Sequence, residues 1–393
     1  EKERTKKMKK TQNNLNIENL IKTEWFEQFD ESQKNEILDG IEANVDVLVY
    51  AKPEFYWEQM EQIRLGLEDN LDVSVYDKKE YNYRQMKEIR LGLETDLDVS
   101  IYAKKEYNSS QMLQIRIGLE KNLNISQYAK FEYNERQMAE IREGLEKGLD
   151  VSVYADSEYS NNQMKEIRLG LEKNLDISIY TKTEFSFSEM GEIRLGLEDN
   201  LDVSWYAKKH FVWEEMKEIR LGLEKNLDVS IYANPDFDYY KMGKIRKCLE
   251  KNLDYSFFLK QSFDNLQMDK ISEGLEENLD VLLYADPKFN WRQMDEIMIG
   301  LEKGLDVSIY ANPDFNYYKM AEIRRGLEKN LDVSIYAKTE FSDNEMKLIR
   351  EGLEENIDVS IYAKPEMDSD KMKLIKNYLI ELKKQKERKN KNE

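Results

Sequence analysis

The chain has 393 residues, 40% of them hydrophobic and 35% charged, so it contains enough apolar side chains to bury a core. No stretch approaches the roughly 18 consecutive apolar residues of a membrane span, and the start lacks a signal-peptide pattern. The single cysteine, Cys248, excludes an internal disulfide framework, and the single histidine, His210, excludes histidine-rich metal sites and most histidine-based catalysis. We therefore expect a cytoplasmic protein without a membrane segment.

The net charge of −19 is unevenly distributed along the chain. Residues 1–10 carry six basic and two acidic side chains (+4), and residues 373–393 carry eight basic and three acidic ones (+5), which leaves −28 for the body between them. Such a body repels nucleic-acid phosphates and attracts basic surfaces. The alternative interpretation is that these acids form only a solvated face.

A repeat of 26 residues runs through the chain, and methionine sets its register. Lys34 takes the methionine place in a degenerate first repeat, which gives fourteen repeats in all. A fixed period in this range is typical of solenoids. We predict a basic segment and degenerate cap in residues 1–29, tandem repeats in residues 30–367, and a capping helix with a basic tail in residues 368–393. The methionines are Met60, Met86, Met112, Met138, Met164, Met190, Met216, Met242, Met268, Met294, Met320, Met346 and Met372.

Each repeat opens with a predicted helix of about twelve residues. In the second repeat, Met60, Ile63 and Leu67 form one helical stripe. Twelve of the fourteen repeats place Ser, Asn or Asp four residues before the methionine as an N-cap. Eleven of the fourteen have Gln or Glu three residues after the cap place, as a capping box requires. An aromatic residue such as Phe55 precedes the cap place in thirteen repeats and should pack on the methionine. Asn or Gly, as at Asn70, follows the helix where a left-handed residue is needed.

A glycine lies inside this predicted helix in twelve repeats, although it costs about 1 kcal/mol relative to alanine. Gly66 flanks the apolar stripe, so we interpret its place as the point where neighbouring helices approach closely. Cys248 occupies the same place in one repeat. We expect it to be a small buried residue rather than a redox group.

The remainder of the repeat, LDVSIYA at residues 97–103, fits two structures. Its alternation of Val, Ile and Tyr suits a strand, which would give a β/α leucine-rich-like solenoid. Asp at the second place in twelve repeats instead indicates the N-cap of a short helix of five or six residues, with Val99, Tyr102 and Ala103 on one face. We favour an all-α class, an α/α solenoid of about fourteen helix–turn–short-helix repeats, and keep the β/α solenoid as the alternative.

The sequence shows no catalytic constellation: it lacks a phosphate-binding glycine loop, GxSxG, CxxC and HExxH. Its recurrent acids have structural explanations, since Asp72 reads as a cap and Glu68 lies four residues after Arg64, at ion-pair spacing. The loops also lack the aspartate pattern of calcium sites. We predict a protein that is not an enzyme and has no cofactor, catalytic residue or metal site. Residues 246–272 break the repeat pattern and could be a decayed repeat, a kink or a partner site.

The two places after the helix cap vary between repeats and are often aromatic. Aromatic residues dominate interface energetics, and the first of these places lies at the edge of the buried stripe. These side chains therefore either line a continuous binding ridge or pack on the loop of the adjacent repeat. The candidate binding residues are Trp57, Tyr83, Phe187, Trp213, Tyr239, Tyr240, Trp291, Tyr317 and Tyr318.

The phrase QMxEIRxGLExxLDVSxYAxPxF, which covers about residues 30–372, resembles a repeat carried by uncharacterised proteins of Firmicutes phages and mobile elements. The resemblance implies a bacterial cell or an infected host bacterium as the setting. We accordingly predict a protein-binding scaffold that sequesters a host defence protein, with the identity of this partner and the oligomeric state left open. Two alternatives are an acidic DNA mimic that blocks a nucleic-acid-binding enzyme, and a helical repeat that binds nucleic acid directly, which the body charge of −28 disfavours.

Overall fold

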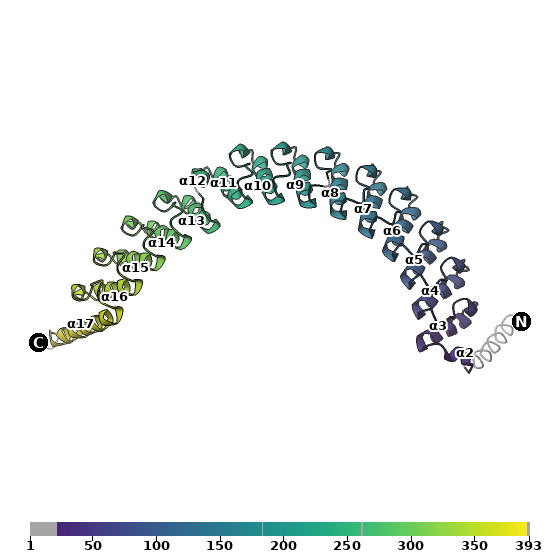
Figure 1. Ribbon diagram of the computed structural model, residues 1–393, viewed down its shortest axis with the longest axis horizontal. Coiled ribbons are helices and arrows are strands. Elements are labelled where there is room, and N and C mark those ends of the chain that lie inside the picture. The colour runs from purple at the N-terminus through teal and green to yellow at the C-terminus, as the bar shows by residue number, and fades with distance from the viewer. Residues whose placement is uncertain (1–21, 183, 261, 391–393) are drawn as a thin grey trace. The chain divides into compact units, whose positions relative to one another are not determined.

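The computed structural model describes residues 22–182, 184–260 and 262–390, and it contains helices and turns but no strand in these ranges. It divides into two compact blocks, an N-terminal block of residues 1–200 and a C-terminal block of residues 201–393. Within each block the long helices lie side by side in one row, and the short 3-10 helices form a second row (Figure 1). This arrangement confirms the predicted all-α solenoid, and the described residues give no support to the β/α alternative. Residues 1–21 of the predicted N-terminal segment lie outside the described residues.

In the N-terminal block, long helices alternate with 3-10 helices in every full repeat. The α-helices are α2 (Glu24–Glu27), α3 (Glu31–Glu42), α4 (Trp57–Glu68), α5 (Tyr83–Glu94), α6 (Ser109–Glu120), α7 (Glu135–Glu146), α8 (Asn161–Glu172) and α9 (Phe187–Glu198). The 3-10 helices are η1 (Val47–Val49), η2 (Val73–Val75), η3 (Val99–Ile101), η4 (Ile125–Gln127), η5 (Val151–Val153) and η6 (Ile177–Ile179).

The C-terminal block continues the same alternation, with one exception at α12. Its α-helices are α10 (Trp213–Glu224), α11 (Tyr239–Lys251), α12 (Ser256–Lys260), α13 (Asn265–Glu276), α14 (Trp291–Glu302), α15 (Tyr317–Glu328), α16 (Asp343–Glu354) and α17 (Ser369–Asn390). Its 3-10 helices are η7 (Val203–Trp205), η8 (Val229–Ile231), η9 (Val281–Leu283), η10 (Val307–Ile309), η11 (Val333–Ile335) and η12 (Val359–Ile361).

The predicted signals for the start and end of the long helix are confirmed in α5. The Asn82 side-chain oxygen accepts from the Gln85 N–H (3.1 Å), while Gln85 Oε1 accepts from the Asn82 N–H (2.9 Å). Two of the orphan amides at the helix start are thereby satisfied. After the helix, Asp96 adopts a left-handed φ of 55°, as Asn70 does after α4 with a φ of 57°.

The second element is a helix, as predicted, but it is shorter than the predicted five or six residues. Asp98 caps η3 by accepting from the Ser100 N–H (3.1 Å), and η3 has only three residues. Tyr102 leaves the helical range (φ −122°), and its hydroxyl donates back to the Glu88 carbonyl of α5 (3.0 Å). The short helix thus ends at the tyrosine, whose side chain is held against the long helix.

The glycine inside the long helix serves a different contact from the predicted one. A Cβ on Gly92 would lie 2.0 Å from the Tyr102 hydroxyl and 2.8 Å from Val99 Cγ1, both in the second element of the same repeat. Gly66 makes the equivalent close approach to Tyr76 (2.0 Å). The predicted close approach of neighbouring helices is thus made to the short second element of the same repeat, where the glycine leaves room for the tyrosine.

Apolar side chains and a glutamine bond hold successive repeats together. The methionine and isoleucine of the stripe, such as Met86 and Ile89, are fully buried. Gln85 completes its own capping box and also donates through Nε2 to the Tyr107 carbonyl of the next repeat (2.7 Å). The same bond, at 2.5–2.7 Å, is made by Gln33, Gln59, Gln111, Gln137, Gln163, Gln267 and Gln293.

Arginine adds an ionic connection between repeats. Arg116 Nε donates to Glu88 of the preceding repeat (2.9 Å), and Arg116 also pairs with Glu120 in its own helix. The pairing within the helix confirms the prediction from the four-residue spacing. The second partner, 28 residues upstream, was not predicted. Where the upstream residue is glutamine, the arginine donates to a neutral amide oxygen instead of a carboxylate, as Arg142 does to Gln114 (2.9 Å).

The irregular repeat replaces its 3-10 helix with the five-residue helix α12. Cys248 stands at the glycine place and is buried, as predicted. Phe258 stands at the tyrosine place, is fully buried and has no hydroxyl. Ser272 replaces the arginine and donates to the Met268 carbonyl of its own helix (2.8 Å). The cysteine side chain therefore takes up space that the tyrosine hydroxyl occupies in the regular repeats, and phenylalanine leaves that space free.

Candidate interaction surface

The candidate binding residues occupy the first or second position of the long helices, where the fold does not enclose them. Six of the nine are exposed, with exposed fractions between 36% and 55%: Trp57, Tyr83, Phe187, Trp213, Tyr239 and Tyr318. The other three are half-buried: Tyr240, Trp291 and Tyr317. None of the nine belongs to the fully buried stripe that holds the repeats together.

These aromatic residues form short runs instead of an uninterrupted ridge. Ser109, Glu135 and Asn161 take the first helical position between Tyr83 and the next aromatic residue, and Asn265 interrupts the series again. The runs that fall within one block are Trp57 with Tyr83, Trp213 with Tyr239 and Tyr240, and Trp291 with Tyr317 and Tyr318.

Tyr240 takes part in packing between repeats. Its hydroxyl donates to Asp269 of the following long helix (2.6 Å), and Lys244 lies 5.4 Å from its ring centroid while pairing with the same carboxylate (2.5 Å). Burial and this hydrogen bond raise the pKa of Tyr240 to about 12. Tyr240 therefore contacts the adjacent repeat, but through the long helix α13 and not through the loop that the alternative interpretation named.

Trp291 and Tyr317 bracket an arginine of the chain itself. The Arg292 guanidinium lies 5.2 Å from the Trp291 ring and 5.0 Å from the Tyr317 ring of the next repeat, and Arg292 Nη1 donates to the Tyr317 hydroxyl (3.2 Å). The Tyr318 ring stacks on Tyr317 with a centroid distance of 3.9 Å. Two rings at the first helical positions of consecutive repeats can therefore receive one guanidinium between them.

Sequence reasoning missed two residues beside the candidate tryptophans. Tyr56 and Val212 occupy the N-cap place before Trp57 and Trp213, and they are 76% and 48% exposed. Neither side chain makes a cap hydrogen bond, although Gln59 still accepts from the Tyr56 N–H (2.9 Å). Loss of a cap costs about 1 kcal/mol. The signal was present in the sequence, because these are the two repeats without Ser, Asn or Asp at that place.

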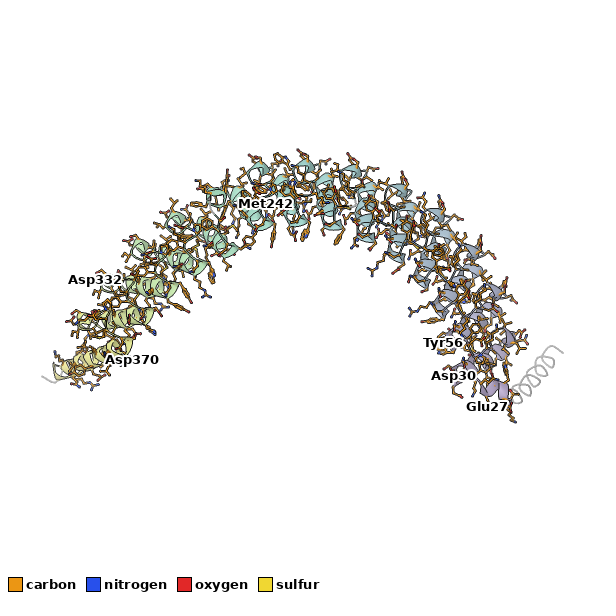
Figure 2. The ribbon with its side chains drawn as sticks, viewed as in Figure 1. Glu27, Asp30, Tyr56, Met242, Asp332 and Asp370 are labelled. Atoms are coloured by element: carbon orange, nitrogen blue, oxygen red, sulfur yellow. The ribbon has the colours of Figure 1, made fainter. Side chains whose placement is uncertain are left out.

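A cleft of about 700 Å³ lies at the starts of α3, α4 and α5. Tyr56 and Tyr83 contribute rings to its lining, and Glu54, Glu58 and Glu80 contribute carboxylates. Figure 2 labels Tyr56 and Asp30, which also lines the cleft, near one end of the N-terminal block. The cleft therefore combines exposed aromatic surface with negative charge.

The arginines that bind a glutamate of the preceding repeat form a series that we call the arginine ladder. Its glutamates differ from the carboxylates of the cleft because they are already paired. Burial raises the pKa of Glu140 more than its bond with Arg168 lowers it. For Arg168, burial acts to lower the pKa, but its bonds and attraction to Glu140, Glu143 and Glu172 raise it overall. The arginine therefore stays charged, while the partly buried Glu140 carboxylate loses more from dehydration than the pair returns.

The single cysteine and the clusters of acidic side chains are the remaining candidates for chemistry among the described residues. Burial raises the pKa of the Cys248 thiol to about 11, which disfavours the reactive thiolate. Among the described residues, no group of three or more His, Cys, Asp or Glu side chains is placed to hold a metal ion. Over the same residues, no helix combines the length and apolar character needed to cross a bilayer.

Comparisons with known proteins do not place the chain in a family. No protein-family model matches it, and searches of curated proteins and of solved structures return no significant match. The resemblance to a phage and mobile-element repeat stays a prediction.

Proposed function

We propose that this chain is a non-enzymatic repeat scaffold that binds a protein partner through the aromatic residues at the starts of its long helices. The observation that carries the proposal is the exposure of Trp57 and Trp213 (41% and 39%) in a fold whose repeats are held together by other residues. Exposed tryptophan and tyrosine supply large contact areas at small entropic cost and are enriched among interface hot spots.

The accompanying loss of two helix caps supports this proposal. Tyr56 and Val212 give up a stabilising hydrogen bond and are not buried in return. Positions that break a local stability rule without a compensating contact are typical of functional surfaces. Both positions stand directly before an exposed tryptophan, which favours these two places over the remaining aromatic residues.

The pairing of the ladder acids weakens the alternative of a DNA mimic. A mimic needs free carboxylates in a phosphate-like pattern, whereas Glu88, Glu166 and Glu218 each accept a bond from an arginine of the next repeat. Direct nucleic-acid binding is disfavoured by the same negative body. The resemblance to a phage repeat suggests a host defence protein as the partner and a bacterial cell as the setting, which we include in the proposal.

An affinity pull-down from lysate of an AT-rich Gram-positive host tests the proposal. The intact chain is compared with a triple variant, Trp57→Ala, Trp213→Ala and Trp291→Ala. A matched control changes Ser109, Glu135 and Asn161 to Ala, because these residues hold the same helical position in other repeats. We expect one stoichiometric protein that the parent and the control retain and the triple variant loses.

Washing with salt distinguishes a partner held by aromatic contacts from one held by charge. A partner held by aromatic contacts stays bound at 0.5 M NaCl, whereas exposed charges are screened within about 10 Å already at 0.1 M. If the triple variant retains the partner and salt removes it from all three proteins, the charge-mimic alternative replaces the scaffold proposal. If the parent retains no protein, the binding proposal itself is contradicted.

A further inference from the structure

Two places in the chain repeat one four-part arrangement. At the start of α4, the cap place holds the exposed Tyr56, the first helical position holds Trp57, the second holds Glu58, and the next long helix begins with Tyr83. The start of α10 repeats this order with Val212, Trp213, Glu214 and Tyr239. Each arrangement lies within a single block, and the two are six repeats apart in sequence.

The start of α14 shows what such a ring pair can hold. There Trp291 and Tyr317 stand at the same two positions, and Arg292 occupies the position of Glu58 and Glu214. Its guanidinium lies 5.2 Å from one ring and 5.0 Å from the other. In this repeat the chain fills the place between the rings with its own cation.

The other two arrangements carry a carboxylate where α14 carries the arginine. Neither Glu58 nor Glu214 forms a hydrogen bond or an ion pair with any described residue, in contrast to the glutamates of the arginine ladder. Arg84, one repeat later, stands at the position that matches Arg292. Its guanidinium lies 5.5 Å from the Tyr83 ring, and its Nε donates to the Tyr83 hydroxyl (3.0 Å). Tyr83 thus already contacts a cation of its own repeat, whereas no cation of the described residues lies over the Trp57 ring and Glu58 stays unpaired.

The surroundings of the first arrangement add further negative charge. Glu54 and Glu80 line the cleft beside Glu58, and neither is paired with a described residue. Lys79 is the single basic residue among those that line the cleft. A cation entering here would gain ring faces and carboxylates together, which is the combination that favours guanidinium over a neutral or anionic group.

We propose that the ring pairs Trp57–Tyr83 and Trp213–Tyr239 are receptor sites for arginine side chains of the protein partner, with Glu58 and Glu214 as the carboxylates that pair with them. The inference rests on the proposed scaffold function and names the chemistry that its partner must present. Lysine fits less well, because its compact ammonium cannot stack on a ring or bond a carboxylate in two places at once. Phosphate-rich partners are excluded at these sites by the unpaired acids.

The test uses the full chain and the indole N–H signals of its five tryptophans in a nitrogen–proton correlation spectrum. The probe is the capped tripeptide acetyl-Gly-Arg-Gly-amide, and the control is the same peptide with citrulline, a neutral isostere of arginine. We expect the Trp57 and Trp213 signals to shift with a millimolar dissociation constant, while those of Trp25 and Trp205 stay in place. The citrulline peptide should bind at least about tenfold more weakly.

Swapping glutamate and arginine between the α14 arrangement, which holds Arg292, and the other two arrangements makes the test more specific. In the variant Glu58→Arg with Glu214→Arg, the new arginines should occupy the ring pairs as Arg292 does, so Trp57 and Trp213 should no longer respond to the peptide. The variant Arg292→Glu should open the third ring pair, so Trp291 should begin to respond. Glu135→Arg, at a first helical position without neighbouring rings, is the control for net charge and should leave the response of Trp57 and Trp213 unchanged.

Each result decides the inference. Equal shifts by the arginine and citrulline peptides, or an unchanged response in Glu58→Arg with Glu214→Arg, would overturn it. A response of Trp57 that appears only after residues 1–10 are removed would show that the basic segment of the chain itself fills the first site, which also overturns it. If the peptide fails but the tryptophan variants still lose a protein from lysate, the receptor sites are wrong while the scaffold function stands.

Discussion

The regular repeat around Gly92 and the irregular repeat around Cys248 solve the same packing problem in two ways. In the first, glycine leaves space for the Tyr102 hydroxyl, which donates to a carbonyl of the long helix. In the second, the glycine place carries a thiol, and the aromatic residue ten positions later is Phe258, without a hydroxyl. The two places therefore act as one steric unit, and changing one requires a change in the other.

The two repeats also differ in their connections to the next repeat. Gln85 reaches the Tyr107 carbonyl, whereas Lys241 stands at the glutamine place of the irregular repeat and lies 4.2 Å from the Phe237 ring that precedes its own helix. Ser272 replaces the arginine that elsewhere reaches a carboxylate or amide of the preceding repeat. The irregular repeat keeps the apolar stripe and lacks the glutamine bond. Tyr240 and Lys244 connect it to the next repeat through Asp269, and Arg246 connects it to Glu218 of the preceding one.

The largest effect is expected for Gly92→Ala, which imposes a side chain on the regular repeat without removing the hydroxyl. A Cβ would lie 2.0 Å from the Tyr102 hydroxyl, so we expect local destabilisation of about 3 kcal/mol, near the upper end of overpacking effects. Hydrogen exchange of the α5 amides measures it, because repeat arrays do not unfold in a single all-or-none step.

Two further variants make that result interpretable. Adding Tyr102→Phe to Gly92→Ala should restore most of the protection, as in the irregular repeat. Gly191→Ala is the matched control, since its Cβ would meet its nearest atom at an ordinary 3.5 Å, and it should be neutral or stabilising. Equal loss of protection in the single and the double variant would refute the paired role of the two places.

Gln85→Glu breaks the polar connection while keeping the cap. Glu189 shows that a carboxylate at this place still accepts from the N-cap N–H (2.7 Å), but a carboxylate cannot donate to the Tyr107 carbonyl. Two acceptors would then face each other, so we expect a loss of about 2 kcal/mol, read from the exchange of amides in α5 and α6. The reverse change, Glu345→Gln, should increase protection in α16 and α17. A Glu345→Gln variant without that gain would show that the glutamine bond contributes nothing to stacking.

Cys248→Gly should destabilise the irregular repeat by about 1 kcal/mol, because it removes a buried side chain and places glycine in a helix whose aromatic neighbour has no hydroxyl to fill the space. The double variant with Phe258→Tyr should recover the loss by recreating the regular pair. Hydrogen exchange of the α11 amides compares the three proteins. A double variant less stable than Cys248→Gly would mean that α12 cannot hold a tyrosine as η3 does.

The smallest effect is expected for Glu140→Gln, which replaces a partly buried carboxylate with the amide that other repeats already use. The change in stability at pH 7 should stay within about 0.5 kcal/mol, because the cost of burying the carboxylate offsets what its pair with Arg168 contributes. The pKa of Glu140 is raised in the folded chain, so its contribution is fully present below its ordinary range and is lost as the pH rises through the raised value. Relative to the parent, the variant should therefore be more stable at pH 7 than at pH 4, as measured by the exchange protection of the α7 amides, corrected for the pH dependence of intrinsic exchange. The opposite trend would show that the pair with Arg168 outweighs burial.

The candidate surface was partly readable from the sequence. The variable aromatic places follow from the repeat register, and the lost caps at Tyr56 and Val212 could have been recognised as departures from a rule kept by twelve repeats. The place of Arg292 between two rings could not, because the distance between side chains of consecutive repeats depends on how the helices stack. The proposed roles of Glu58 and Glu214 follow only from comparison with Arg292 and its two neighbouring rings.

The sequence alone determined the period and the limits of the long helices, and it favoured the all-α class over the β/α alternative. Capping boxes, left-handed residues and the apolar stripe are local signals, and each acts within one or two helical turns of the residue that carries it. Only the tertiary structure decided why the glycine is needed, which repeat Gln85 and Arg116 reach, and how short the second helix is. These features join residues 10 to 28 positions apart, and contacts at that range depend on the packing of one element against another.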